Sequence, residues 1–175
     1  MSSKILERIQ IHPVMLPIDL NAATITGDYV SLKNYERLLC VLCCGDGTAG
    51  SDVDIQLYQS TDVSNSLADA KVLDVIETGR LYTKEHATAL TGVGQWTEET
   101  QATADERWEP ADSGELVLLW AVEIKADDLD VDNNFDCVRM DIIDPGAAKI
   151  GAAFYILADP KYPADPTRML SALAD

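Results

Sequence analysis

The sequence predicts an all-β fold, a β-sandwich or jelly roll with extended N- and C-terminal arms. Short runs that are apolar, or that alternate between apolar and polar residues, recur along the chain. Turn-forming clusters rich in Gly, Asp, Asn and Ser separate these runs, and little of the sequence suggests helix. Several short strands with turn signals between them are typical of sandwiches and jelly rolls.

The 175 residues are enough for one domain with a single core. Surface scaling indicates that about 70% of the unfolded chain's surface is buried on folding. Prolines punctuate both ends, which favours extended arms on either side of a folded centre. We therefore expect an N-terminal arm (residues 1–28), a β-sandwich core (29–159) and a C-terminal arm (160–175).

The N-terminal arm is expected to be extended over residues 11–20, because Pro13 and Pro17 stop any helix there. Ser3 can cap a short helix before it, with Glu7 in the first turn. The extended part carries four apolar anchors, Ile11, Val14, Leu16 and Ile18. A compact monomer has limited use for such arms, so their apolar side chains suggest contacts with neighbouring subunits.

The first two core strands are expected at 35–44 and 53–58. The first is almost wholly apolar from Leu38 onward, as in a buried strand, and the second alternates apolar with polar residues, as in a half-buried one. Because the Gly-rich segment 45–51 joins them, we expect the two strands to form an antiparallel hairpin.

The remaining elements follow the same logic. Residues 64–69 are polar enough for one helical turn, 71–82 form another strand, and 85–94 are ambiguous between loop and short helix. The clearest core element is 115–125, which is so apolar that we expect it to be covered on both faces. A turn at 127–130, strands at 135–142 and 150–157 and a final helical turn at 169–173 complete the chain.

The four cysteines are interpreted as buried apolar side chains. Cys40, Cys43 and Cys44 share one apolar run. Residues three apart in a strand point to opposite faces, so Cys40 and Cys43 cannot share a metal there. Cys137 stands apart, and a second ligand pair is missing. A Cys44–Cys137 disulfide is geometrically possible, but a reducing cytosol disfavours it.

Charge excludes several classes of function. Thirteen Lys and Arg against thirty Asp and Glu give a net charge of −17. Nucleic acid and anionic membranes both require a basic face, so neither is an expected partner. No apolar run reaches the roughly 18 residues that span a bilayer, and the N-terminus lacks a signal-peptide core. We therefore expect a soluble protein made inside the cell.

Two acidic stretches are candidates for a calcium site or a catalytic carboxylate pair. The alternation of Asp128, Asp130, Asp132 and Asn134 resembles the first half of a calcium loop. However, Asn133 replaces the turn glycine and Arg139 replaces the twelfth-position Glu, which favours a solvated turn without metal. The acids between residues 98 and 115 favour an exposed loop over a paired-carboxylate glycosidase site.

Catalytic and cofactor signatures are weak, so we expect no enzyme and no cofactor. The sequence lacks a Gly-x-Ser-x-Gly elbow, a phosphate-binding loop and a dinucleotide fingerprint. A triad would have to use His12, on the proline-bounded arm, or His86, beside Glu85. Both are interpreted as ordinary surface histidines.

Six short segments carry a resemblance to a known family. Pro17–Ala23 and Thr26–Tyr35 are followed by Ala126–Asp130 and Phe135–Arg139, and then by Ala153–Leu157 before Lys161-Tyr162. This order of phrases resembles a family of small virion structural proteins of tailed bacteriophages and prophages, from about Pro17 to Tyr162. The resemblance rests on no catalytic signature, and it implies a protein akin to capsid decoration (cement) proteins, many of which are jelly rolls or sandwiches.

The physical interpretation and the resemblance together predict a capsid decoration protein that clamps major capsid subunits on the outside of the head. We expect it to form a dimer or trimer, to be made in the host cytoplasm and to reside on the capsid surface of the virion. Its expected contact residues are Ile11, Val14, Leu16 and Ile18 in the N-terminal arm, Trp96 and Trp108 in the acidic region, and Tyr162, Met169 and Leu170 in the C-terminal arm.

Three alternatives remain open at this stage. The first is a neck, head–tail joining or tail protein, which would use the same sandwich in a ring. The second is a glycan- or host-surface-binding module, in which Trp96, Trp108 and the acidic turn form a calcium-assisted site. The third is a hydrolase that uses Glu85 with His86 or an acid pair.

Overall fold

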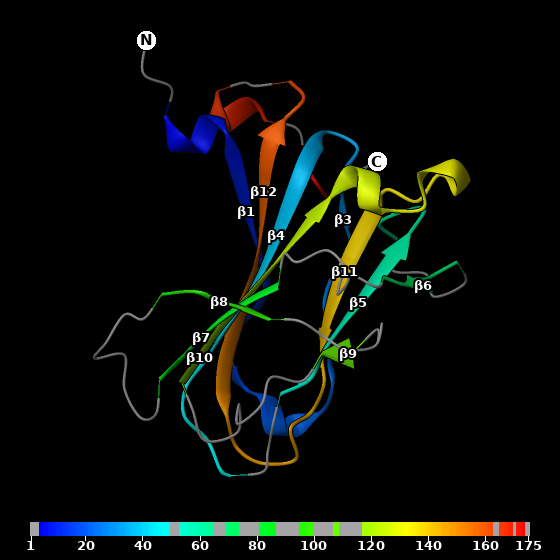
Figure 1. Ribbon diagram of the computed structural model, residues 1–175. Helices are drawn as coiled ribbons and strands as arrows, with labels where there is room; N and C mark the ends of the chain where they lie inside the picture. The colour runs from blue at the N-terminus through cyan, green and yellow to red at the C-terminus, as the bar shows by residue number, and fades with distance from the viewer. Residues whose placement is uncertain are drawn as a thin grey trace.

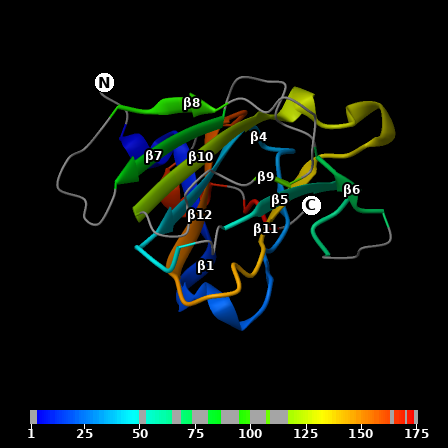
Figure 2. The same ribbon diagram turned by 60° about the horizontal axis from the view of Figure 1, so that its bottom comes forward.

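The computed structural model describes residues 4–49, 53–64, 69–73, 81–86, 95–99, 107–108, 117–162, 165–169 and 171–173. In these residues the chain forms two antiparallel β-sheets packed face to face (Figures 1 and 2). This architecture confirms the predicted all-β sandwich. None of the helices in these ranges is long and apolar enough to cross a bilayer.

Sheet A contains the longest strands. Across the sheet the order is β1 (Ile9–Asp19), β12 (Ile150–Pro160), β4 (Tyr35–Cys44), β10 (Val117–Lys125), β7 (Leu81–His86) and β8 (Thr97–Glu99). Strands β4 and β10 therefore lie in the middle, which explains their apolar sequences. Every neighbouring pair in the sheet is antiparallel.

Sheet B is smaller, and its central strands are β11 and β5. The order is β2 (Ile25–Thr26), β11 (Cys137–Ile142), β5 (Ile55–Ser60) and β6 (Lys71–Val72), while β3 (Val30–Ser31) pairs with β11 and β9 (Arg107–Trp108) pairs with β5. Short 3-10 turns complete the described elements: η1 (Ile5–Glu7), η2 (Leu20–Ala22), η4 (Ala126–Asp128), η5 (Val131–Asn133) and η6 (Pro166–Arg168).

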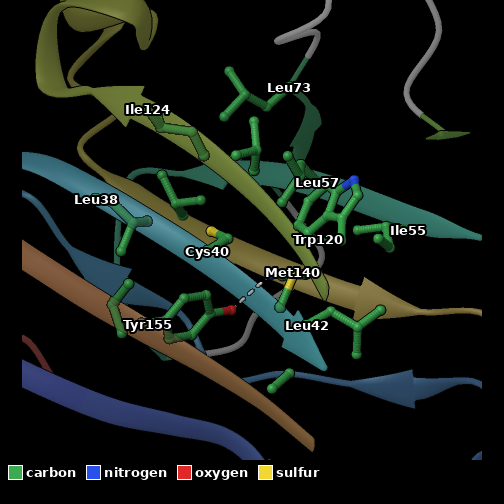
Figure 3. Close-up of a cluster of buried hydrophobic side chains, with 14 of the residues drawn as sticks. Leu38, Cys40, Leu42, Ile55, Leu57, Leu73, Trp120, Ile124, Met140 and Tyr155 are labelled. Atoms are coloured by element: carbon green, nitrogen blue, oxygen red, sulfur yellow. Dashed lines mark hydrogen bonds between the residues drawn. The ribbon is translucent and has the colours of Figure 1, made fainter. Parts of the chain in front are cut away.

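The core lies between the sheets. Leu38, Cys40 and Leu42 of β4 point toward Leu57 and the rest of sheet B, and Figure 3 shows their side chains in one cluster with Trp120 and Ile124 of β10. Tyr155 of β12 reaches across this core: the backbone N–H of Met140 in β11 donates a hydrogen bond of 2.6 Å to its phenolic oxygen (Figure 3). The two sheets are therefore joined by a polar contact as well as by apolar packing.

The expectation that all four cysteines are buried is wrong for Cys43, because the cysteines of β4 follow the strand alternation. Cys40, Cys44 and Cys137 are buried, Cys43 is exposed, and all four are free thiols. Cys40 and Cys43 thus point to opposite faces of β4, as the spacing predicts. Burial raises the pKa of the Cys44 thiol to about 12 and that of Cys40 further still.

The N-terminal segment differs from the expected free arm, because residues 9–19 form edge strand β1 of sheet A. Ile11 pairs with Ile156 and His12 with Tyr155, and irregularities in the register occur between Pro13 and Met15 and beyond. The segment is extended, as its prolines require, yet it pairs with its own sheet. Prolines are tolerated there because the outer edge of an edge strand needs no further backbone donor.

The expected hairpin between residues 35–44 and 53–58 is wrong. Strand β4 pairs with β12 and β10 in sheet A, whereas β5 pairs with β11 in sheet B. The intervening Gly-rich segment therefore crosses from one sheet to the other. Both strands bury alternate side chains in the same core from opposite sides, and this alternation is equally compatible with a hairpin.

The C-terminal segment returns to the core. Strand β12 extends to Pro160, and the carbonyl of Ala172, which is 3% exposed, accepts a 2.7 Å hydrogen bond from the backbone N–H of Ser31. The last helical turn is η6, earlier than the expected 169–173, and Met169 follows it in an extended conformation. Asp165 caps η6 by accepting from the Thr167 N–H, which fixes its start.

Other boundaries shift modestly. The expected strand 71–82 appears as β6 and the start of β7, with 74–80 outside the described residues. Positions 65–68, 87–94 and Ser3 also lie outside them, so the turn at 64–69, the ambiguous segment 85–94 and the proposed cap remain predictions, although η1 begins at Ile5.

Candidate interaction surface

The side chains of sheet A that point away from sheet B form a broad apolar surface, which we call the outer A face. Strand β4 shows how it arises: Leu38, Cys40 and Leu42 are buried in the core, while Leu39 and Val41 between them are only partly buried. Because successive side chains in a strand alternate, a run that is apolar at every position must present apolar side chains to both faces.

The strand register aligns these outward residues across the sheet. Val41 lies between Phe154 of β12 and Ala121 of β10. Ile156 pairs with Leu39 on one side and Ile11 on the other. The outward apolar positions are Ile9, Ile11 and Pro13 of β1, Ile150, Ala152, Phe154, Ile156 and Ala158 of β12, Leu39, Val41 and Cys43 of β4, Leu119 and Ala121 of β10, and Tyr82 of β7.

Charge lies at the ends of this surface and along its β8 edge, where Glu98 pairs with Tyr82. At one end Arg37 pairs with Glu123 of β10 at 3.3 Å and with Asp159 of β12 at 3.3 Å. At the other end Lys84 lies outward on β7, opposite Leu119. Between these ends the outward positions of β12 and β4 are uncharged from Leu39 to Cys43 and from Ile150 to Ala158. Such a surface is unusual for a chain of net charge −17.

Trp96 closes the surface at its far edge. Its indole is 45% exposed, and it meets the ring of Tyr82 edge-on at 6.5 Å between centroids. The Nζ of Lys84 lies 4.7 Å from the centre of the same ring, within the range of a cation–π contact. Trp96, an expected contact residue, is thus held beside β7 and β8 with its ring accessible to a partner.

The four expected N-terminal contact residues are divided by the structure. Ile11, Leu16 and Ile18 are 53%, 70% and 47% exposed along β1, where they adjoin the outer A face. Val14 is only partly exposed and packs against the core. Its Cγ1 lies close to Gly27, where an added Cβ would also come within 2.5 Å of the Met140 carbonyl oxygen. Val14 therefore supports the fold from the inside.

The remaining expected contact residues lie elsewhere. Tyr162 is 72% exposed just beyond β12, and Met169 is half-buried against the core and the start of β1. The backbone of Trp108 is in β9, paired with Ile55, while its side chain falls outside the described part of the chain. Leu170 also lies outside the described residues.

The expected contact residues do not include the centre of the surface, which consists of Leu39, Val41, Leu119, Phe154 and Ile156. A signal was present: strands 35–44 and 115–125 are apolar at consecutive positions, which predicts cover on both faces. Among the described residues, the inner face of sheet A has its cover in sheet B, and no second sheet lies over the outer face. The short turns η1 and η6 adjoin only its β1 corner, where Leu6 and Pro166 line a cavity with Ile9 and Ile11.

The outer face of sheet B has a different chemistry. Arg139 and Asp141 of β11 point away from the core, and the guanidinium Nε and Nη2 each lie 3.0 Å from a carboxylate oxygen. Tyr29 and Tyr58 lie on the guanidinium at 4.9 and 4.7 Å, and the Gly27 N–H donates to Asp141 at 3.2 Å. Only 3% of Arg139 and 5% of Asp141 is exposed, and this burial raises the pKa of Asp141 although Arg139 opposes the shift.

The acidic turn near residue 130 is organised by its own hydrogen bonds. Asp128 accepts from the backbone N–H of Lys125 at 2.6 Å, and Asp130 accepts from Asn133 Nδ2 at 2.8 Å and pairs with Lys71. The Lys71 and Asn133 hydrogen bonds lower the pKa of Asp130. In the described ranges no three His, Cys, Asp or Glu side chains are grouped to hold a metal.

The two histidines lie on strands of sheet A, and the structure describes the side chain of His12. His12 lies on β1, its ring stacked at 6.4 Å on Tyr155 with Nε2 buried, so it is not the expected surface histidine. Its partial burial follows from the pairing of β1 with β12. His86 and Glu85 end β7, and their side chains fall outside what the structure describes.

Comparisons with known proteins give distant matches. No protein-family model matches the chain, and no curated protein sequence matches it. Among solved structures, the SPBc2 prophage-derived protein YomS is similar with 10% identity and a TM-score of 0.38, covering 86% of this chain and 93% of that one. A structure of infectious bursal disease virus (Gt strain) is similar with 9% identity and a TM-score of 0.27, covering 94% of this chain and 44% of that one. These values describe a remote likeness and assign no function.

Proposed function

We propose that this chain is a bacteriophage virion structural protein, and specifically a capsid decoration protein that binds the outside of the head and clamps neighbouring major capsid subunits. The observation that carries the proposal is the wide apolar surface on a strongly acidic sandwich. A protein that remains dissolved by its charge, yet keeps one sheet face and one edge strand apolar, has the properties of an assembly component.

The capsid contacts are assigned to the side of the molecule around β1. Leu16 and Ile18 are exposed there without being part of the central surface, and Tyr162 is exposed beyond β12. Pro13 and Pro17 cannot donate backbone hydrogen bonds, so strand addition at this edge is disfavoured and side-chain contacts are left as the means of binding. Many weak contacts of this kind, repeated over a shell, stabilise the assembled state by multivalency.

The proposal includes no catalytic role, no cofactor, and no nucleic-acid or membrane partner. A net charge of −17 opposes phosphate binding. The order of sequence phrases from Pro17 to Tyr162, which resembles small virion proteins of tailed phages, supports location in the virion on the capsid surface.

The test is the copy number of the chain in purified particles, measured by quantitative mass spectrometry against the major capsid protein. A decoration protein is present at a fixed ratio to the shell subunits, and Leu16→Asp with Ile18→Asp should remove it from the heads while the purified chain stays folded. A count fixed to the tail vertex would instead assign a neck or tail protein. Absence from particles would contradict the proposal.

A further inference from the structure

We propose that the outer A face is the contact surface of a homodimer, in which the face of one copy packs on the same face of a second copy about a two-fold axis. This inference concerns the chain in solution and does not depend on a role in the virion. A second copy of the chain would cover the surface centred on Val41, which lies between Phe154 and Ala121.

The first argument is the sequence of the central strands. Strands β4 and β10 are apolar on both faces, as is usual only for strands with cover on each side. Sheet B covers the inner face, as Figure 2 shows, and the described residues place no second sheet on the outer one, whose β1 corner adjoins the turns η1 and η6. A second copy of the chain would supply cover for the part that the described residues leave open.

The second argument is charge. Each copy carries a net charge of −17, so two copies repel each other wherever their acidic surfaces meet. Among the described residues, the acids of the outer A face lie at its margins: Glu123 and Asp159 are paired with Arg37 at one end, and Glu98 of edge strand β8 pairs with Tyr82. A partner of opposite charge would contact exposed acids, whereas an uncharged centre suits a partner as acidic as the chain itself.

The third argument is area. Six strands about 4.8 Å apart span about 24 Å, and eight residue steps along β12 from Ile150 to Ala158 span about 27 Å, giving about 650 Å² per copy. Two copies would bury about 1,300 Å², within the range of stable protein interfaces. Packing of two sheets face to face is also the means by which this chain forms its own core.

A two-fold axis makes the contact self-complementary, so residues at the middle of one face meet the middle of the other. Large side chains, Phe154, Ile156 and Leu119, alternate there with the smaller Ala152, Ala121 and Cys43, as interdigitation of two sheets requires. The rim carries both signs of charge, with the Arg37–Glu123 pair at one end and Lys84 at the other.

The experiment is sedimentation equilibrium of the full chain over a dilution series. The wild-type protein should have twice the monomer mass of 19.1 kDa and dissociate on dilution. Val41→Asp and Val41→Lys should each weaken the dimer by at least about 100-fold, because each places two like charges in the buried contact. An equimolar mixture of the two variants should recover a dimer, since a two-fold contact brings the opposite charges together.

The matched control is Val72→Asp, the same substitution on β6 of sheet B, where Val72 is 39% exposed. It should leave the dimer unchanged, and circular dichroism checks that all variants are folded. A wild-type monomer, or a dimer lost with Val72→Asp and kept with Val41→Asp, would overturn the proposal.

A second measurement needs no variant. Cys43 is the exposed thiol among the four cysteines and lies on the outer A face, so its alkylation rate should rise as the wild-type dimer is diluted. An alkylation rate independent of concentration would overturn the proposal: a fast rate would mean an open face, and a slow rate would mean cover by the chain itself.

Discussion

The outer faces of the two sheets differ in chemistry and in how they are shielded from solvent. On sheet B, the ion pair of Arg139 with Asp141 is sealed beneath Tyr29 and Tyr58 of the same chain. On sheet A, the apolar side chains around Val41 have no second sheet over them in the described residues. The polar face thus contributes to the stability of one chain, and the apolar face is the one that we propose for contacts between chains.

The energies support this division. Removing about 650 Å² of mainly apolar surface from each copy, about 1,300 Å² in the dimer, is worth at most on the order of 30 kcal/mol before the cost of association is subtracted. A buried ion pair adds little net stability, but breaking it is costly because one charge is left without its partner. Substitutions on the outer face of sheet B should therefore lower the stability of the chain, and substitutions on the outer A face should weaken the proposed contact between copies.

The largest effect on folding is expected for Arg139→Leu. Asp141 would remain buried without its cationic partner, although the Gly27 N–H would still donate to it, so the free energy of unfolding should fall by about 3–5 kcal/mol. Urea denaturation measures it. Val41→Asp, compared in its monomeric form, should cost less, about 1 kcal/mol, because Val41 is only partly buried in the single chain.

The control for this contrast is the double variant Arg139→Leu with Asp141→Leu, which removes both charges. It should be more stable than the single variant, since no unpaired charge remains buried. Equal losses from Arg139→Leu and Val41→Asp would mean that the two faces do not differ as described.

The next effect concerns thiol reactivity. Burial raises the pKa of Cys44 from 9.0 to about 12, so its thiolate fraction near neutral pH is about 1,000-fold below that of an ordinary thiol. In the monomeric Val41→Asp variant, Cys43 should be alkylated first, while Cys40, Cys44 and Cys137 react only on unfolding. Peptide mass spectrometry identifies the modified residue, and early modification of Cys44 would be inconsistent with its place in the core.

A smaller effect is expected for Tyr155→Phe. The Met140 N–H would lose the acceptor that lies 2.6 Å away in the core, at a cost of about 1–2 kcal/mol of unfolding free energy. Phe154→Leu, at the neighbouring outward position, is the matched control and should change the stability of the monomer by less. The reverse order would indicate that the inner and outer sides of β12 are assigned wrongly.

The smallest effect is a titration shift in the acidic turn. Lys71→Met should return the pKa of Asp130 toward 3.8, because the Lys71 hydrogen bond is the largest cause of its lowering. With a folded pKa below the unfolded one, ionised Asp130 favours folding above pH 3.8, and this contribution is lost as pH falls through the lowered pKa. Carboxyl NMR titration measures the shift, and an unchanged pKa would exclude the Lys71 contact in solution.

Strand positions could be predicted from the sequence because alternation and turn residues are local signals. The run from Leu38 to Cys44 and the run 115–125 both appear as core strands. Their partners could not be predicted in the same way. Strand 53–58 alternates as it would in a hairpin with β4 or in a facing sheet, and nothing local distinguishes the two.

Only the margins of the outer A face could be predicted from the sequence. Ile11 and Trp96 attract notice because each is an apolar residue among prolines or acids. Val41 and Phe154 could not be recognised in this way. In a strand that is apolar at successive positions, the sequence does not distinguish an outward apolar residue from an inward one. Which face of β4 and β12 is covered by sheet B depends on the long-range pairing of strands, and it becomes visible once both sheets are in place.

The most direct test of the two-face account is a methyl NMR experiment on a mixture of isotope-labelled and unlabelled chains, which detects contacts between copies. We expect intermolecular signals at Leu39, Val41 and Ile156, and none at the core residues Leu38 or Leu118. Signals confined to Leu16 and Ile18, or the absence of any intermolecular signal, would contradict it.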